Sequence, residues 1–252
     1  MAHFEYHWSR REPVVVRECP EGGGMWEPEE LGELVRESRV VNCTTGEEEV
    51  MDMRGFFATF RGTRRGPLLK LRDWPAHAAL REVAPEHVRD FARMLPFPEV
   101  TSEGGALNVA AAMEGCVVRP DLGPKFYVAD GRGPEAPCRD SVTKLHTDAS
   151  CAANVLVRCF ADGQRAGADG PAGAIWHIFR MADHAALRAW LLQKRAAREL
   201  KYTAAVVGND PWVYLLAAEL DALKRETGIE PWQFEQRERE AVLIPCGSPH
   251  QV

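Results

Sequence analysis

The sequence predicts an α+β protein whose core is mainly β. Three observations indicate this class: short apolar runs with β-branched and aromatic residues dominate from Lys125 onward, helical stretches lie before and between them, and Gly and Pro mark the turns. With 252 residues, the chain can bury a substantial core in one domain. We expect a mixed α/β support region over residues 1–120, followed by a β core over residues 121–252.

The support region is expected to alternate between strands and helices. Strands are predicted over residues 13–16 and 68–71, and helices over residues 28–39, 51–60 and 85–95. These elements would pack outside the β core as a supporting layer.

The core region is expected to contain four strands and two helices. Strands are predicted over residues 142–148, 152–160, 173–179 and 240–244, with a loop of small residues at 161–172, and helices over residues 183–200 and 211–227. Asp210 is the expected N-cap of the second helix, Pro211 its first residue and Gly228 the residue past its end.

His146, Thr147 and Asp148, together with the distant His250, are the most informative residues for function. Successive side chains on a strand alternate between faces, so His146 and Asp148 would point the same way. Two imidazoles and one carboxylate form the facial triad of non-haem Fe(II) oxygenases, which leaves coordination positions for a cosubstrate and O₂. In a chain with 8 histidines such a triplet also occurs as an ordinary surface pair, but the strands on either side and the Gly/Pro turn before His250 favour a metal site.

Several segments together resemble the JmjC-domain lysine demethylases, in the branch that acts on lysine 9 of histone H3. The resemblance runs from about His7 to Val252. It is carried by residues 12–16, 41–43, 69–75, 120–127, 143–148, 173–179, 232–236 and 241–252.

The resemblance implies a double-stranded β-helix, the jelly-roll, cupin-like JmjC barrel, with surrounding helices. Residues 1–252 would form a single JmjC catalytic domain. The family has a closing strand after the position of Val252, so the domain is expected to be C-terminally truncated and His250 to be held loosely.

The resemblance also implies an activity. His146, Asp148 and His250 would hold Fe(II), and 2-oxoglutarate and O₂ would be consumed to remove a methyl group from mono- or dimethylated lysine 9 of histone H3 as formaldehyde. The resemblance implies the histone H3 tail as the partner, with chromatin-associated proteins as further partners, and the nucleus as the location.

Three further residues are predicted to bind the cosubstrate. Thr143 stands where related enzymes place a hydroxyl that binds 2-oxoglutarate, although a bulge must aim it inward because it does not share strand parity with His146. Asn154 resembles an asparagine of the family. For the distal carboxylate, Lys125 is preferred over Lys144 and Arg158. His177 is expected to be packed rather than to bind metal.

Composition excludes some classes. The net charge of −6 argues against non-specific binding to duplex DNA, which needs a basic surface. No apolar run is long enough to cross a membrane. The 7 cysteines form no CxxC pair, so we expect reduced thiols and no zinc module. Two other functions remain open: a JmjC hydroxylase of another protein or RNA, and a non-catalytic JmjC scaffold.

Overall fold

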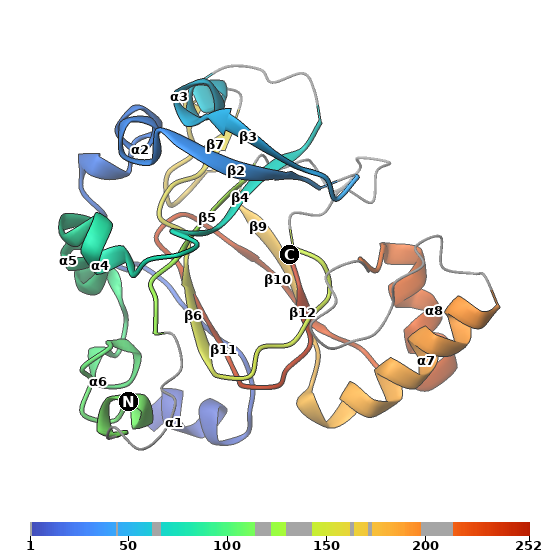
Figure 1. Cartoon of the computed structure of the whole chain (residues 1–252). Coiled ribbons are helices and arrows are strands. Elements are labelled where there is room, and N and C mark those ends of the chain that lie inside the picture. Colours follow the sequence, from blue (N-terminus) through green and yellow to red (C-terminus); the bar gives the residue numbers. More distant parts are fainter. Residues whose placement is uncertain are drawn as a thin grey trace.

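The computed structural model describes residues 2–43, 45–61, 67–113, 122–129, 143–161, 164–170, 173–197 and 214–252. Antiparallel sheets occupy the middle of the molecule, and helices lie on both sides of them (Figure 1). This mixed architecture confirms the α+β class.

Two three-stranded antiparallel sheets form the centre. One has the order β1 (Val14–Val16), β11 (Ala241–Ile244) and β6 (Ala152–Val155), and the other β10 (Trp232–Gln236), β9 (Ala174–Ile178) and β12 (His250–Gln251). Side chains from both sheets meet in one apolar cluster, whose buried members are Trp176, Ile178, Val242 and Ile244. The two sheets therefore pack face to face, which places His250 on the wall of a packed interior.

A second core supports this centre. The four-stranded antiparallel sheet has the order β3 (Glu48–Asp52), β2 (Glu37–Asn42), β4 (Leu69–Trp74) and β5 (Phe126–Ala129). Its strands share an apolar cluster with the helices of the first hundred residues. That cluster includes Trp26, Leu31, Val40, Phe56, Phe57, Leu71, Leu80 and Met94.

The remaining elements are short helices and one hairpin. The helices of the first region are α1 (Ala2–Ser9), α2 (Pro28–Val35), α3 (Met53–Ala58), α4 (Leu80–Val83), α5 (Pro85–Met94) and α6 (Pro98–Thr101). The 3₁₀ segments are Gly24–Trp26, Thr59–Arg61, Val109–Ala112 and Met181–Asp183. The hairpin strands are β7 (Phe160–Ala161) and β8 (Gln164–Arg165).

Two longer helices, α7 (His184–Ala196) and α8 (Ala217–Thr227), lie together on one side of the central sheets (Figure 1). Their apolar faces bury Leu187, Leu191 and Leu223 against Leu145 and Phe179. This cluster fixes the position of Leu145, the residue immediately before His146.

The helix predicted over residues 28–39 is too long. It ends at Val35 because Arg36 adopts a positive φ of 55°, and the following residues form β2 between β3 and β4. Val40 and Val41 favour a strand, and the pairing of β2 with β3 and β4 sets the boundary between α2 and β2. Residues 51–60 and 85–95 contain α3 and α5, and residues 13–16 and 68–71 contain β1 and the start of β4, as predicted.

Other boundaries also differ. The described part of residues 142–148 is irregular, with a single β-bridge at His146, and the strand predicted over 152–160 stops at Val155. Helix α8 begins at Ala217, with Leu216 as its N-cap, whereas Asp210 and Pro211 lie outside the described residues. Gly228 does end α8, with φ 76° and its N–H donating to the carbonyl of Lys224.

The two predicted regions are interlocked by strand pairing. β1, from the first region, pairs with β11, while β5, from the second, pairs with β4. None of the helices in the described residues is both long and apolar enough to span a membrane. Cys19, Cys43, Cys151, Cys159 and Cys246 are free thiols, and the other two cysteines lie outside the described residues.

Candidate metal centre

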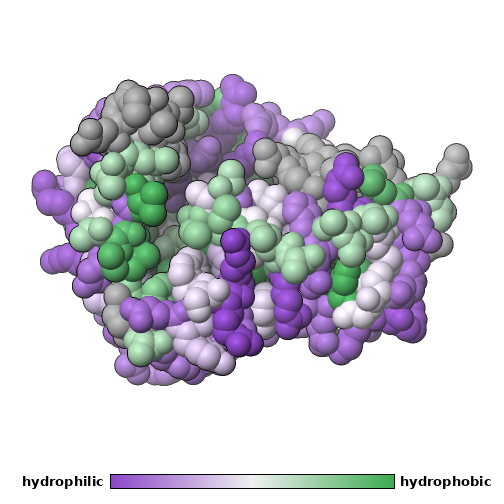
Figure 2. Space-filling view, turned by 90° about the horizontal axis from the view of Figure 1, so that it is seen from below, coloured by the Kyte–Doolittle hydropathy of each residue, from purple (hydrophilic) through white to green (hydrophobic). Residues whose placement is uncertain are grey.

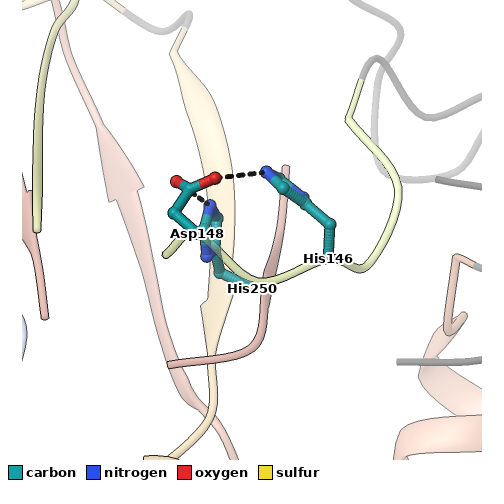
Figure 3. Close-up of side chains that lie close together, drawn as sticks. All are labelled: His146, Asp148 and His250. Carbon is teal, nitrogen blue, oxygen red and sulfur yellow. Dashed lines mark ion pairs between the residues drawn. The ribbon is translucent and has the colours of Figure 1, made fainter. Parts of the chain in front are cut away.

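Three side chains from two distant segments converge on one point. His146 Nε2 lies 3.8 Å from Asp148 Oδ1, and His250 Nε2 lies 3.7 Å from Asp148 Oδ2. One potential ligand atom from each residue lies within 4.8 Å of the others. Figure 3 shows the carboxylate of Asp148 facing both imidazoles. The convergence predicted from the sequence is therefore present.

Backbone pairing brings these segments together. His146 and His250 form a two-way bridge, with N···O distances of 3.0 and 2.9 Å, and the N–H of Gly247 donates to the carbonyl of Asp148 at 3.0 Å. On its other side, His250 pairs with Ile178 of β9. His146 and Asp148 thus reach the site from an irregular segment, whereas His250 reaches it from a strand that is paired on both sides. The expectation that His250 is held loosely is therefore wrong, because backbone bonds to two segments fix it.

The second nitrogen of each imidazole has a backbone partner. His146 Nδ1 lies 2.8 Å from the carbonyl of Lys144, and His250 Nδ1 lies 3.0 Å from that of Ser248. A carbonyl can only accept, so in both neutral rings Nδ1 carries the proton and Nε2 has a free lone pair. Both lone pairs are therefore available to a metal, and the backbone sets both ring orientations.

Burial makes the second histidine a good ligand. Its side chain is 3% exposed, and burial, followed by the nearby imidazole of His146, lowers the pKa of His250 to about 4. The ring is therefore neutral at pH 7. The side chains of His146 and Asp148 are 25% and 40% exposed, so the centre opens to solvent on their side.

Thr143 is the first described residue of the segment that carries His146 and Asp148. Its N–H and carbonyl pair with those of Val252, at 3.2 and 2.9 Å. Two residues separate Thr143 from His146, but only Gln251 separates Val252 from His250 on the opposite side. This extra residue is a β-bulge, which confirms the expected change of parity.

Lys70 is a neighbour of Thr143 that sequence reasoning missed. Its Nζ donates to Thr143 Oγ1 at 2.7 Å and lies 5.5 Å from the centre of the Tyr127 ring. Burial lowers the pKa of Lys70 to about 8. The motif 69–75 contained this lysine, but only the pairing of β4 with β5 and the fold of residues 143–146 bring it to Thr143.

Tyr127 lies beside Lys70. Its hydroxyl is 3.4 Å from Asp73 Oδ1, and the residue is 57% exposed. Loss of hydration and the charges of Asp73 and Asp148 raise the pKa of Tyr127 to about 12. The phenol is therefore neutral at physiological pH, and the charge of Asp148 contributes to the raised pKa.

Asn154 belongs to a network behind His250. Gln236 Nε2 donates to Asn154 Oδ1 at 3.2 Å, and Trp176 Nε1 donates to Gln236 Oε1 at 2.9 Å. The Trp176 ring is stacked near that of His250, with centroids 6.0 Å apart. Asn154 is thus connected to His250, a candidate metal ligand, through two intervening residues, Gln236 and Trp176.

The three cations considered from the sequence have other partners. Lys125 Nζ donates to the carbonyl of Pro75 at 2.6 Å, and Lys144 Nζ donates to that of Cys43 at 3.1 Å. Arg158 Nε donates to Glu27 Oε1 at 2.9 Å. His177 is buried with its Nδ1 near Gln251, and burial lowers its pKa, in agreement with the expected packed role.

The donor set fits Fe(II). Two imidazoles and one carboxylate on one side, with solvent on the other, match the ligands and open positions of non-haem iron sites. Within the described residues, this is the one group of three or more His, Cys, Asp or Glu side chains placed to hold a metal.

Comparisons with known proteins agree with this chemistry. Lysine-specific demethylase JMJ26 of Arabidopsis thaliana is 30% identical over 315 residues, which cover 100% of this chain and 36% of that protein. JMJ29 of the same plant is 29% identical and again spans 100% of the chain, and lysine-specific demethylase 3A of Gallus gallus is 32% identical over 99% of it. No protein-family model matches.

These relatives are much longer than this chain. It spans 36% and 37% of the two plant proteins and 22% of the Gallus gallus protein. Within that span the similarity runs from end to end, which confirms the resemblance predicted from the motifs.

Proposed function

We propose that this chain, a relative of the lysine-specific demethylases over its whole length, is an Fe(II)- and 2-oxoglutarate-dependent histone lysine demethylase. The observation that carries the proposal is the convergence of His146, Asp148 and His250, with both Nε2 lone pairs directed inward and one side open to solvent. With iron bound, the site would use O₂ to oxidise 2-oxoglutarate to succinate and CO₂ and an N-methyl group to formaldehyde, with one oxygen atom going to succinate and the other to the methyl carbon.

The protein contributes position and charge. Asp148 supplies the one negative charge of the ligand set, and the carbonyls of Lys144 and Ser248 hold the two imidazoles in the tautomer that binds metal. Stacking against Trp176 fixes the plane of His250, and the Asn154–Gln236 contact fixes Trp176. We assign Asn154 this supporting role in addition to the predicted cosubstrate contact.

For the distal carboxylate of 2-oxoglutarate, Lys70 and Thr143 form the better pair. A buried ammonium and a hydroxyl 2.7 Å apart can bind one carboxylate together, and burial strengthens the interaction. Lys125 is less suitable because its ammonium already donates to the loop carbonyls of Pro75 and Ala78. Lys70 therefore replaces Lys125 in this role.

The substrate side is defined by Tyr127 and Asp148. An exposed aromatic ring beside carboxylates attracts a methylammonium group through its π face and the local negative charge. A net charge of −6 also suits a lysine-rich tail. We propose mono- and dimethylated lysine 9 of histone H3 as the substrate, following the resemblance, and the nucleus as the site of action.

The fold proposed for residues 1–252 is a single JmjC domain. The two facing three-stranded sheets would form the double-stranded β-helix, and the four-stranded sheet with its helices the support region.

The experiment is a survey of methylated histone peptides with the Fe(II)-loaded protein, 2-oxoglutarate and O₂. Succinate formation and a loss of about 14 mass units, one CH₂, for each methyl group removed from the lysine 9 peptide are expected together. Asp148→Ala should abolish both, whereas Asp221→Ala, which makes the same charge change at an exposed position of α8 outside the three-residue centre, should not.

Two results would redirect the assignment. Succinate formation with a gain of one oxygen on a protein or RNA substrate, and no methyl loss, would indicate a hydroxylase. Absence of Fe(II) binding and of turnover in the folded protein would indicate a scaffold. Demethylation of a different histone lysine would retain the activity and overturn only the lysine 9 assignment.

A further inference from the structure

A second concave site lies outside the metal centre, between the connection from α1 to β1 and the connection from β9 to α7. It is a cavity of about 310 Å³ lined by Arg10, Arg11, Glu12, Arg180, Met181 and Trp232, among others. Both connections lie on the lower side of the molecule in Figure 1, and Figure 2 shows strongly hydrophilic side chains in the middle of that face.

The lining carries an excess of positive charge. Glu12 pairs with Arg10 at 3.0 Å and with His7 at 2.6 Å. Among the described residues, neither Arg11 nor Arg180 has a carboxylate within ion-pair distance. Two guanidinium groups therefore face one cavity with their charge uncompensated, in a protein whose net charge is −6.

Both guanidinium groups are already held in place. Arg180 lies over the Trp232 ring, 4.8 Å from its centre, and Arg11 Nη1 donates to Met181 Sδ at 3.0 Å. A thioether is a weak acceptor, and a ring face leaves the N–H edges of a guanidinium available. Little side-chain ordering would be needed to bind an anion, which favours affinity.

The chemistry of the cavity differs from that of the metal centre. A lysine-rich peptide would be repelled by the arginines, whereas arginine forks match the oxygens of phosphate in charge and geometry. Two uncompensated guanidinium groups balance the charge of a phosphoryl dianion better than that of a single carboxylate. We infer that this cavity is a binding site for a phosphoryl group, held between Arg11 and Arg180.

The cavity adjoins the turn that leads to His250. A Cβ placed on Gly247 would lie 3.2 Å from Met181 Sδ, and the N–H of Gly247 donates to the carbonyl of Asp148. Phe179, next to Arg180, also donates its N–H to the carbonyl of Pro249 at 2.7 Å. The two sites are separate but share one structural wall.

The test is calorimetric titration of the full chain at low ionic strength with inorganic phosphate and with the peptide acetyl-Ala-phosphoserine-Ala-amide. We expect saturable binding of one phosphoryl group per chain and none of the unphosphorylated peptide. Arg180→Gln and Arg11→Gln should each weaken binding by about tenfold or more, because each removes charged hydrogen bonds. The affinity of Arg180→Lys should lie between those of the wild type and Arg180→Gln, because lysine keeps the charge but loses the two-pronged hydrogen bonding of the guanidinium.

Arg89→Gln on α5 is the matched control, because Arg89 is 67% exposed and pairs with Glu86 away from this cavity. Tighter binding of the phosphopeptide than of phosphate would assign the site to a phosphorylated polypeptide, and equal binding to small phosphate compounds. No saturable binding by the folded wild type would overturn the inference, as would equal losses in Arg89→Gln and Arg180→Gln at unchanged thermal stability.

Discussion

The two segments that carry the candidate metal ligands differ in how firmly they are held. His250 lies on β12, is 3% exposed, and pairs with His146 on one side and with β9 on the other. His146 and Asp148 lie on an irregular segment with more exposed side chains and fewer backbone bonds. One candidate ligand is thus anchored in the core, and the other two are partly exposed to solvent, on the side where the proposed cosubstrate and substrate would enter.

Activity and folding stability should therefore depend on different segments of the chain. A mutation on the open segment should remove activity at little cost to folding, whereas a mutation on the anchored strand should reduce both. The predictions below test that separation, beginning with the largest expected effect.

Asp148→Ala should abolish turnover and leave the fold intact. Asp148 supplies the one anionic ligand, yet its side chain is 40% exposed, so little packing is lost. Peptide-dependent succinate formation and the melting temperature are the two measurements. Activity above about one hundredth of wild type, a tolerance that corresponds to about 2.7 kcal/mol of transition-state stabilisation, would contradict the iron assignment.

His250→Ala should destabilise the metal-free protein much more than His146→Ala. Removal of a buried ring leaves a cavity beside Trp176, for which we expect a loss of about 2–4 kcal/mol in the free energy of unfolding. For His146, whose side chain is 25% exposed, the loss should stay below about 1.5 kcal/mol. Urea unfolding of both variants decides the comparison, and equal losses would show that the two segments are held alike.

Thr143→Val should raise the KM for 2-oxoglutarate by about one to two orders of magnitude. The substitution keeps the shape of the side chain and removes a hydrogen bond to a charged group, worth about 1.5–3 kcal/mol. Steady-state kinetics with varied 2-oxoglutarate measure the effect. An unchanged KM would give the Thr143 hydroxyl a structural role through its bond to Lys70.

The value of kcat/KM for 2-oxoglutarate should fall as pH rises through about 8. Burial lowers the pKa of Lys70 to about 8, so the free enzyme loses this positive charge above that pH and binds the carboxylate less well. Lys70→Arg should retain the charge and flatten the alkaline limb. A wild-type profile that stays level well above pH 8 would remove Lys70 from the cosubstrate site.

Ser248→Ala should have the smallest effect. Its hydroxyl is buried without a hydrogen-bond partner among the described residues, so its removal should change the free energy of unfolding by less than about 1 kcal/mol, in the stabilising direction. Metal affinity should not change, because His250 Nδ1 bonds to the backbone carbonyl of residue 248. Weaker Fe(II) binding in this variant would show that the hydroxyl also supports the ligand.

Local sequence was enough to predict several elements. Strand β1, helices α3 and α5 and the cap at Gly228 depend on neighbouring residues, and their positions agree with the predictions. The end of α2 did not follow from local pattern, since the residues after Arg36 satisfy their backbone bonds in a sheet with β3 and β4.

The chemistry of the proposed metal centre could be predicted from residue types alone, because His146, Asp148 and His250 are donors that suit Fe(II) whatever their exact backbone. The cation that accompanies Thr143 and the arginines that share a cavity could be identified only in the folded structure. Lys70 and Thr143 are 73 positions apart in the sequence, and most residue pairs at that separation are not in contact. Whether a lysine is buried or exposed depends on the residues that pack around it. Residue type is local information, whereas burial and proximity arise when distant strands pair.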